Sequence, residues 1–416
     1  MIKSLKYLFI FTISISPYIF LRAFSFNLTF FDISLILFSL IYLFKQKPKK
    51  IIKNIFIDID SKLKIYYFLA IPFVLLSFFA LINQIAIKES FFGTLQITFI
   101  LLFMIPILYY VLDMELYKKC IDFLIYGWQI FIIINLFILS NEAFYHGGRF
   151  ASFYGLPVDF SPLAAVFIIL LIYKFRKEKN IYLKISTALF IVANMYLLNL
   201  SGSRGSFLAM LLGIVIYFII LNSFSLQFFK NILIIIIALS LVNFMPLIAN
   251  KVETFIDDMN DIEDVNVRTQ RNVFNRVVSV NDNGRIRDYK AAFKLIPNVF
   301  FLGYGIDTSD IVVAKYGGRH RPHNLFLSIW LEVGFIGFIL SLGIFWLMLG
   351  WGLKLIYERV IKKREVNELI AATYCSGLIL FISNQVSTAS VHRGYWIFWG
   401  FCLWISTKKE YYYKTN

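Results

Sequence analysis

Cysteine and histidine are scarce in this chain, which has 3 cysteines and 4 histidines among 416 residues. None of the cysteines (Cys120, Cys375 and Cys402) falls in a predicted outer loop, so we expect no disulfide framework. No two histidines have zinc-ligand spacing. The chain also has neither a phosphate-cradling loop nor a serine nucleophile elbow. These absences argue against zinc, nucleotide-hydrolysing and serine-nucleophile enzymes, and we predict no metal site and no cofactor.

Charged residues are also few, at 16% of the chain, whereas 59% of the residues are hydrophobic. Apolar stretches recur, and most are long enough to cross a hydrocarbon layer of ~30 Å as a helix. The predicted fold is therefore all-α, a polytopic membrane bundle over residues 1–416 without a separate soluble domain. We count twelve spans, at about residues 5–22, 26–44, 65–83, 91–111, 121–140, 161–173, 184–200, 206–222, 231–248, 330–353, 369–386 and 395–407.

The basic residues orient these spans. With twelve spans, the basic segments at residues 45–53, 174–184 and 354–364 fall on one side together with both termini. The positive-inside rule makes this side the cytoplasm. No cleavable signal peptide is evident, because the first apolar span lacks a small-residue cleavage site. The formal charge of +16 does not indicate nucleic acid, since most basic residues flank spans.

Arginine is concentrated on the opposite side. The predicted cytoplasmic side has 22 Lys and 3 Arg, and the outer side has 5 Lys and 11 Arg. Orientation alone explains the lysines, but a surplus of arginine on the outer side needs a ligand. The rigid fork of arginine donors suits phosphate and carboxylate groups. We therefore expect an anionic substrate at the outer face.

The largest outer loop runs from about residue 249 to 322, and a loop of this length is usually functional. Part of it has the spacing of a helix that could lie at the membrane surface and end at Pro297. The apolar residues of that face are Ile286, Tyr289, Phe293 and Ile296.

A second outer feature is the segment of residues 201–206, SGSRGS, between two spans. Its glycines relieve steric limits, and its serines are expected to cap a helix that starts at about Ser206. A helix N-terminus favours anions, and Arg204 adds a fixed charge there. The segment is either a phosphate site or a tight hairpin whose arginine reaches lipid headgroups.

The third feature is the segment of residues 319–324, RHRPHN. Pro322 fits the first turn of a helix. His323 would then lie near a helix N-terminus, where the dipole favours a neutral ring that could accept a proton. Asn324 could hydrogen-bond a hydroxyl-rich ligand. Alternatively, His323 and Asn324 merely cap the helix.

Other residues on the predicted outer side are candidates for catalysis or substrate binding on the basis of their position alone. Glu332 follows His323 by nine residues and either takes part in chemistry or holds an orienting ion pair. Arg149, next to two glycines, could reach a second anion, with surface solvation as the alternative. His320, Asp159 and His392 are weaker candidates.

These segments resemble motifs of the O-antigen ligase and O-antigen polymerase superfamily. Residues 201–209 resemble its short outer hairpin, and Gly148-Arg149-Phe150 resembles its arginine element before the sixth span. The pattern of its large loop resembles the series Arg285, Tyr289, Pro297, Gly303 and Gly305 of this chain. The motif that follows the loop resembles the series His323, Asn324, Leu325, Glu332, Gly334 and Gly337. The resemblance covers about residues 145–340. The chain departs from the family at residues 155–162, where Asn-Pro-Asn is frequent, and at Tyr289, where tryptophan is frequent.

The resemblance implies a GT-C-like fold with one large periplasmic loop at residues 249–322. It also implies a glycosyltransferase of the bacterial inner membrane that uses an undecaprenyl-diphosphate-linked oligosaccharide at the periplasmic face. Arg149, Arg204 and Arg285 would hold the diphosphate, and His323 would accept a proton from, or position, the acceptor hydroxyl. The scheme requires no metal. Further substrate-binding candidates are Arg287, Arg319, Arg321, Asn324 and Glu332.

A polymerase and a ligase share these motifs. We favour a polymerase, with a chain-length regulator as a possible partner, because no feature points to a lipid A-core acceptor. A protein-glycosylating relative is a further alternative. A flippase should place charges or broken helices near mid-membrane, and here the conspicuous charges lie at the outer boundary. A non-catalytic scaffold would leave the arginine bias unexplained.

Overall fold

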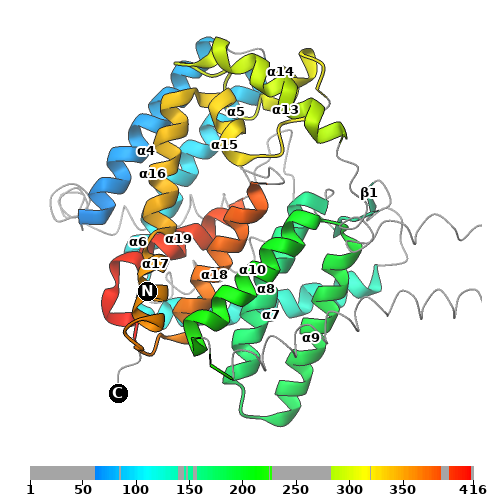
Figure 1. The fold of residues 1–416 in the computed structure, drawn as a ribbon, viewed down its shortest axis with the longest axis vertical. Coiled ribbons are helices and arrows are strands. Elements are labelled where there is room, and N and C mark those ends of the chain that lie inside the picture. Colours follow the sequence, from blue (N-terminus) through cyan, green and yellow to red (C-terminus); the bar gives the residue numbers. More distant parts are fainter. Residues whose placement is uncertain are drawn as a thin grey trace, which may run out of the picture. The chain divides into compact units, whose positions relative to one another are not determined.

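The computed structural model describes residues 61–83, 86–138, 145–146, 149–152, 157–223, 225–226, 283–318, 320–385 and 393–413 (Figure 1). The chain forms two compact units. Unit 1 comprises Met1–Gly127, Asp282–Lys354 and Asn384–Tyr412, and unit 2 comprises Trp128–Asn281, Leu355–Ser383 and Tyr413–Asn416. The described residues are mostly helical, as the composition predicts.

Several helices are suited to a membrane. Within the described residues, 6 helical segments are long and apolar enough to cross one: Ser61–Ile82, Ile87–Val111, Met114–Phe137, Ile181–Leu200, Arg204–Asn222 and Phe335–Val360. Each overlaps a predicted span, whereas the predicted spans at 161–173, 369–386 and 395–407 fall on the helices Pro157–Lys177, Glu368–Asn384 and Arg393–Thr407, which are not among the six. The predicted spans at 5–22, 26–44 and 231–248 lie outside the described residues, so the count of twelve stays a prediction.

Unit 1 contains most of the helices that surround the histidine-bearing segment. Helix α16 packs along α4 and against α15 and α19, and α19 also packs on α6. The elements of this unit are α4 (Ser61–Phe79), η1 (Ala80–Ile82), α5 (Ile87–Phe99), α6 (Ile105–Val111), the first half of α7 (Met114–Phe137), α13 (Asn283–Leu295), η6 (Ile296–Val299), α14 (Ser309–Lys315), α15 (Leu325–Val333), α16 (Phe335–Leu349), α19 (Arg393–Thr407) and η7 (Lys409–Tyr411).

One predicted span contains a break. The hydropathy of residues 330–353 predicts a continuous helix, but α15 ends at Val333 and α16 begins at Phe335. The residue between them, Gly334, has φ +93°, a conformation that side chains disfavour. A Cβ at Gly334 would also lie 2.4 Å from the Phe301 carbonyl oxygen. The span therefore begins at Phe335, and Glu332 belongs to the short helix before it.

The α5–α6 segment changes its helical winding within one predicted span. A π-helical turn, Ile100–Met104, joins the two helices. Pro106 follows at the start of α6 and has no backbone N–H, so it interrupts the regular α-helical hydrogen bonding. This change in winding is a local consequence of the sequence.

The helix predicted around residues 286–296 is present as α13. Its buried face consists of Asp288, Ala291, Ala292 and Leu295, which pack with η6, α14 and α15 in a small core. The large apolar residues Ile286 and Phe293 are 51% and 60% exposed. The predicted apolar face is therefore divided: Tyr289 and Ile296 pack against the core, whereas Ile286 and Phe293 face outward, as placement at a membrane surface requires. That placement stays a prediction.

Unit 2 is built around α8 (Pro157–Lys177), which packs against both α9 (Ile181–Leu200) and α10 (Arg204–Asn222). Trp128 of α7 stacks on Phe167 of α8, with ring centroids 4.2 Å apart, and donates to Asn194 of α9 at 3.1 Å. A two-stranded antiparallel hairpin, β1 (Tyr145–His146) and β2 (Arg149–Phe150), precedes α8. It is a small exception to the predicted all-α fold.

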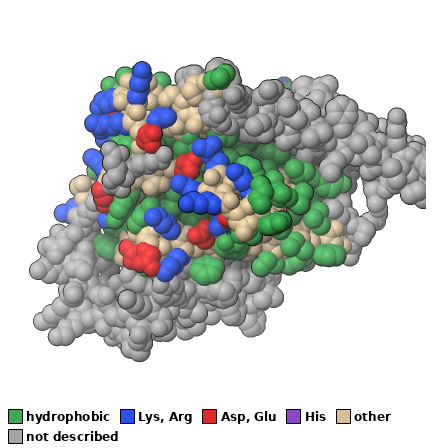
Figure 2. Space-filling view, turned by 90° about the horizontal axis from the view of Figure 1, so that it is seen from below, with side chains coloured by type: hydrophobic (Ala, Val, Ile, Leu, Met, Phe, Trp, Pro, Cys, Tyr) green, Lys and Arg blue, Asp and Glu red, His purple; other side chains and the backbone are tan. Residues whose placement is uncertain are grey.

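The remaining helices of unit 2 carry ion pairs. Glu368, at the start of α18 (Glu368–Asn384), accepts from Arg176 at 2.7 Å and lies 3.3 Å from Lys177. Glu358 of α17 (Trp351–Val360) is 3.1 Å from Lys362 and 3.2 Å from Arg364. Figure 2 shows basic and acidic side chains gathered among apolar ones on one face. The two predicted cytoplasmic segments, 174–184 and 354–364, thus hold part of their charge in ion pairs.

Candidate active site

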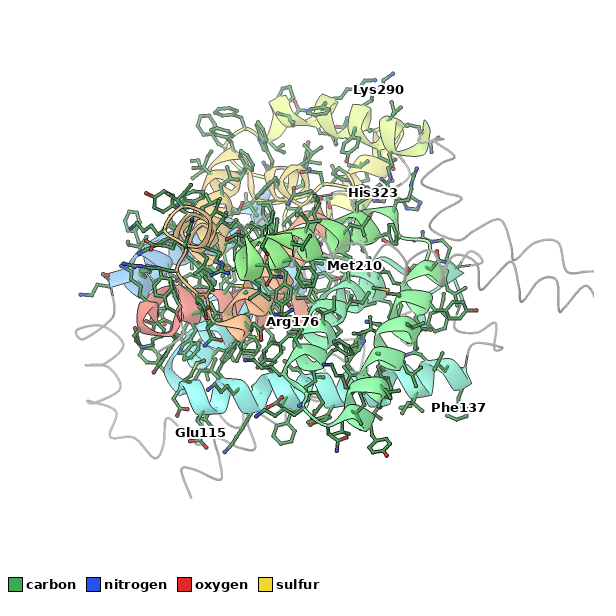
Figure 3. The ribbon with its side chains drawn as sticks, turned by 60° about the horizontal axis from the view of Figure 1, so that its bottom comes forward. Glu115, Phe137, Arg176, Met210, Lys290 and His323 are labelled. Atoms are coloured by element: carbon green, nitrogen blue, oxygen red, sulfur yellow. The ribbon has the colours of Figure 1, made fainter. Side chains whose placement is uncertain are left out.

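The segment of residues 320–324, here called the histidine segment, leads directly into α15. Asn324 is the N-cap, and its Oδ1 accepts a hydrogen bond from the Leu327 backbone N–H at 2.9 Å. The Asn324 amide also donates to the Gln385 carbonyl at 3.4 Å. The prediction that Pro322 lies in the first turn is wrong, because α15 begins at Leu325. Asn324 therefore acts as the cap, and His323 precedes it (Figure 3).

Helix α13 holds the histidine segment through polar contacts. The Tyr289 hydroxyl donates to the His323 carbonyl at 3.0 Å, and the His320 backbone N–H donates to Asp288 at 3.4 Å. Asp288 is buried, with 2% of its surface exposed. Because Arg285 lies one turn before Asp288 and Tyr289 on α13, these contacts bring Arg285 and His323 into the same electrostatic neighbourhood.

The imidazole of His323 is half-buried and neutral at physiological pH. Burial, and then the positive charge of Arg285, lower the pKa of His323 from 6.5 to about 4. Asp288 and Asp310 oppose this shift, and His320 adds to it. A neutral ring can accept a proton, as the position of His323 before a helix predicts.

The other arginines of unit 1 differ in their surroundings. Arg321 pairs with two carboxylates, at 2.9 Å from Asp310 and 3.4 Å from Asp307. The Nε of Arg287 is buried and has no hydrogen-bond partner among the described residues. Such a donor is costly to leave unsatisfied and suits an anionic ligand. Arg319 lies outside the described residues.

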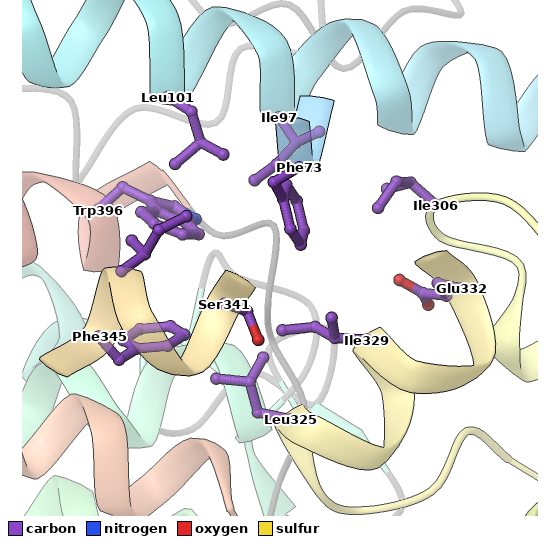
Figure 4. Close-up of a pocket in the computed structure, with 11 residues that line it drawn as sticks. Phe73, Ile97, Leu101, Ile306, Leu325, Ile329, Glu332, Ser341, Phe345 and Trp396 are labelled. Carbon is purple, nitrogen blue, oxygen red and sulfur yellow. The ribbon is translucent and has the colours of Figure 1, made fainter. Parts of the chain in front are cut away.

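Glu332 lies at the far end of α15 from His323. Glu332 lies seven positions after the first residue of α15, a rise of roughly 10 Å along the helix. Its carboxylate accepts from the Ser309 hydroxyl at 2.6 Å and faces a small cavity of about 30 Å³. The cavity is otherwise lined mainly by apolar side chains, including Phe73, Ile329 and Phe345 (Figure 4). Burial, and then the charge of Asp307, raise the pKa of Glu332 to about 7.

Close backbone contacts fix that end of α15. The Tyr304 and Gly305 backbone N–H groups donate to the Leu331 and Glu332 carbonyls at 2.8 and 2.9 Å. A Cβ at Gly303 would lie 2.2–2.3 Å from the Glu332 carbonyl group. Glycine at 303 therefore permits the approach that places Ser309 beside the Glu332 carboxylate.

In unit 2, the structure joins two motifs that are far apart in the sequence. Residues 201–206, here called the arginine turn, connect α9 to α10, and Gly202 has φ +59°. Arg149, on β2, donates from Nε to the Ser201 carbonyl at 2.7 Å. Arg204 is the half-buried first residue of α10. The arginine element and the hairpin are thus neighbours, as a shared role requires.

The serines of the arginine turn do not cap the helix. Helix α10 begins at Arg204, two residues before the predicted start at Ser206, and its N-cap Ser203 makes no side-chain capping bond. The Ser203 hydroxyl instead donates to Ser206 at 3.1 Å, and Ser206 also contacts Ser161 of α8 at 3.0 Å. The buried hydroxyls therefore hold the turn against α8 and leave the first-turn N–H groups without a serine cap.

Sequence reasoning missed several residues that shape these sites. Asp288, Asp307, Ser309 and Asp310 carry no motif, and their partners become apparent once the helices are packed. The sequence prediction joins Arg149, Arg204, Arg285 and His323 in one site. The structure brings Arg149 to the arginine turn in unit 2, and Arg285 to His323 in unit 1. Among the described residues, no three His, Cys, Asp or Glu side chains gather as metal ligands, so we assign none.

A comparison with known families agrees with these motifs. Residues 187–342 match the family described as O-antigen ligase. The match begins in α9, includes the arginine turn and the histidine segment, and ends in α16. No curated protein matches the chain. Members of the matched family are membrane glycosyltransferase-like enzymes, both ligases and polymerases. Residues 187–342 are thus similar to the O-antigen ligase family, in agreement with the resemblance that the motifs of the sequence indicate.

Proposed function

We propose that this protein is a polymerase of O-antigen or another surface polysaccharide. It would join undecaprenyl-diphosphate-linked repeat units at the periplasmic face of the inner membrane. The observation that carries the proposal is the neutral His323 beside Arg285 within the matched domain. Transfer of a glycan from a diphosphate to a hydroxyl needs a proton acceptor and a cation close to each other.

The reaction forms one bond and breaks another. The acceptor hydroxyl oxygen attacks the anomeric carbon of the donor sugar, and the bond from that carbon to the diphosphate oxygen breaks. The bonding electrons leave with the lipid diphosphate, and the hydroxyl proton passes to the His323 imidazole. A ring with pKa about 4 is a weak base. It therefore takes the proton as the new bond forms, when the hydroxyl has become acidic.

Arginines stabilise the departing diphosphate. We assign this role to Arg149, Arg204 and Arg285, with Arg287 as a further donor because its Nε is buried without a partner among the described residues. The N-terminus of α10 adds backbone N–H groups that Ser203 does not cap. Guanidinium forks and helix N-termini both stabilise negative charge that develops on phosphate oxygens.

The alternative is an O-antigen ligase, which transfers the finished polymer to lipid A-core. The description of the matched family favours this alternative. The site requirements are the same, because both reactions break the same sugar–diphosphate bond. The two enzymes differ in the acceptor, so the acceptor decides between them.

A transfer assay with the purified full-length protein tests the proposal. The donor is a defined undecaprenyl-diphosphate oligosaccharide, and the acceptor is either a second lipid-linked repeat or lipid A-core. We expect longer lipid-linked chains and release of undecaprenyl diphosphate with the first acceptor. Transfer to lipid A-core alone would make the protein a ligase. Transfer to neither, under conditions in which the protein stays folded, would refute both functions.

A further inference from the structure

Arg321 is held by carboxylates on two sides. Its Nε and Nη2 lie 3.0 and 2.9 Å from Asp310 Oδ2, and its Nη1 lies 3.4 Å from Asp307 Oδ1. Its backbone N–H also donates to Asp310 Oδ1. Asp310 thus binds both the main chain and the side chain of Arg321, and this double contact ties the histidine segment to α14.

Neighbouring residues of the histidine segment are anchored in the same way by other helices. The Pro322 carbonyl accepts from the Ser328 hydroxyl at 3.2 Å, and α13 holds His320 and His323 through Asp288 and Tyr289. Every residue from 320 to 324 therefore has a polar contact to α13, α14 or α15, or caps α15 itself. A segment fixed at each residue holds the backbone of His323, from which the ring projects, in one place.

We propose that Arg321, with Asp310 and Asp307, is a positioning residue that locks the histidine segment, and is not a ligand of the diphosphate. This inference rests on the proposed function. A diphosphate would have to displace Asp310 and Asp307 from the guanidinium, and both carboxylates would repel it. The contacts of Arg321 connect elements of the protein, so the residue acts on the reaction through the placement of His323.

A double-mutant cycle separates the two roles. We expect Arg321→Ala and Asp310→Ala each to lower kcat by about 10²-fold, because a misplacement of ~1 Å in a reacting group has an effect of that size. The KM for the lipid-linked donor should change little. The double variant should be no worse than either single variant, because the two side chains act as one unit. Lys315→Ala, an exposed cation on α14, is the matched control.

Kinetic results of a different form would overturn the proposal. If Arg321 binds the diphosphate, Arg321→Ala raises the donor KM, whereas Asp310→Ala releases the guanidinium and leaves the KM unchanged or lower. Two further variants test whether the loss of kcat comes from general damage to the fold. Arg321→Lys and the exchange Arg321→Asp with Asp310→Arg should each recover part of the lost kcat.

A measurement without catalysis distinguishes failure of this inference from failure of the proposed function. The rate at which diethyl pyrocarbonate modifies His323 is followed against pH by mass spectrometry, in a His320→Gln background. We expect a midpoint near pH 4 in this background. In the Arg321→Ala and Asp310→Ala variants we expect the midpoint to move towards about 6.5, because loosening the segment hydrates the ring.

The two measurements give distinct answers. If the midpoint moves in both variants but the native protein transfers no glycan, the positioning role of Arg321 is supported and the proposed function fails. If the native protein is active and the midpoint stays near pH 4 in both variants, the positioning role is refuted and the proposed function stands.

Discussion

The arginine turn of unit 2 and the histidine segment of unit 1 each lead into an apolar helix, but the two helices begin differently. Asn324 caps α15 with its side chain, whereas Ser203 makes no such bond to α10. Ser203 is directed to Ser206 instead. A side-chain cap uses one of the N–H donors of a helix start, and Ser203 uses none of them at α10.

The arginines of the two regions also differ. The Nε of Arg149 donates to a neutral backbone carbonyl, that of Ser201, whereas Arg321 is paired with Asp310 and Asp307. An arginine bound by two carboxylates contributes little net charge to its surroundings. Arginine content alone therefore does not identify an anion site. The partner of each guanidinium decides whether it binds a ligand or holds the fold.

We expect the greatest loss of glycan transfer from His323→Ala. If the histidine segment supplies the proton acceptor, transfer should fall by about 10²–10⁴-fold. Long-chain polysaccharide should disappear from cells while the protein stays in the membrane, as measured by gel profile and immunoblot. His320→Ala, three residues earlier and exposed, is the control and should stay within a few-fold of native activity. Normal chain length in His323→Ala would end the assignment of this region.

The next effect belongs to the arginine turn. Arg204→Lys keeps the charge but removes the two-pronged donor, so we expect transfer to fall by about 10²-fold. The reverse exchange, Lys290→Arg on the exposed side of α13 (Figure 3), should have no comparable effect. Native turnover in Arg204→Lys, measured with the lipid-linked donor, would contradict a bidentate role and favour a simple hairpin.

A third prediction concerns how the C-terminal end of α15 is fixed. Gly303→Ala places a Cβ against the Glu332 carbonyl, so we expect a loss of about 3 kcal/mol in the free energy of unfolding. Gly317→Ala is the matched control, because Gly317 has φ +87° but open space around it. It should cost about 1 kcal/mol, from backbone strain alone. Equal losses in thermal unfolding would show that the close contact at Gly303 is not required.

Parts of both regions could be predicted from the sequence. The spacing of apolar residues predicts α13, which is present. The glycines before Arg149 and the SGSRGS motif predict an arginine site, and the structure places Arg149 against Ser201 of that motif. Its role in binding an anion stays a prediction. The position of His323 before a helix predicts a neutral ring, and the pKa of His323 is lowered, but the causes are burial and the charge of Arg285. The helix and the arginine motifs depend on local spacing, which the sequence contains.

The rest depends on contacts between distant residues. Whether Ser203 caps α10 depends on Ser206 and on Ser161 of α8, more than forty residues away. The break at Gly334 depends on the Phe301 carbonyl, and hydropathy does not detect it. From the sequence alone, Arg321 and Arg285 are equal candidates for binding an anion. They differ only because the fold places Asp310 beside Arg321. Residues 319 and 249–282 lie outside the described residues, so their predicted roles stay predictions.

The weakest effect that we expect is on the pH dependence of stability, and it distinguishes two buried glutamates, one in each unit. Glu332 of unit 1 lies in a mainly apolar cavity with a pKa of about 7, and Glu358 of unit 2 bridges Lys362 and Arg364. Because the folded state raises the pKa of Glu332 above its ordinary 4.5, the folded protein binds the proton more tightly. Its contribution to stability is complete below pH 4.5 and is lost as the pH rises through about 7.

Glu332→Gln should therefore stabilise the protein at pH 8 by on the order of 1–2 kcal/mol and have little effect at pH 5. The amide oxygen can still accept the bond from Ser309. Glu358→Gln should instead destabilise the protein at pH 8, since it leaves two cations without their carboxylate. The buried cysteines Cys120, Cys375 and Cys402 report unfolding through a thiol-reactive dye. If Glu332→Gln lowers the unfolding temperature equally at both pH values, the Glu332 carboxylate is charged and required, and the contrast between the two glutamates is wrong.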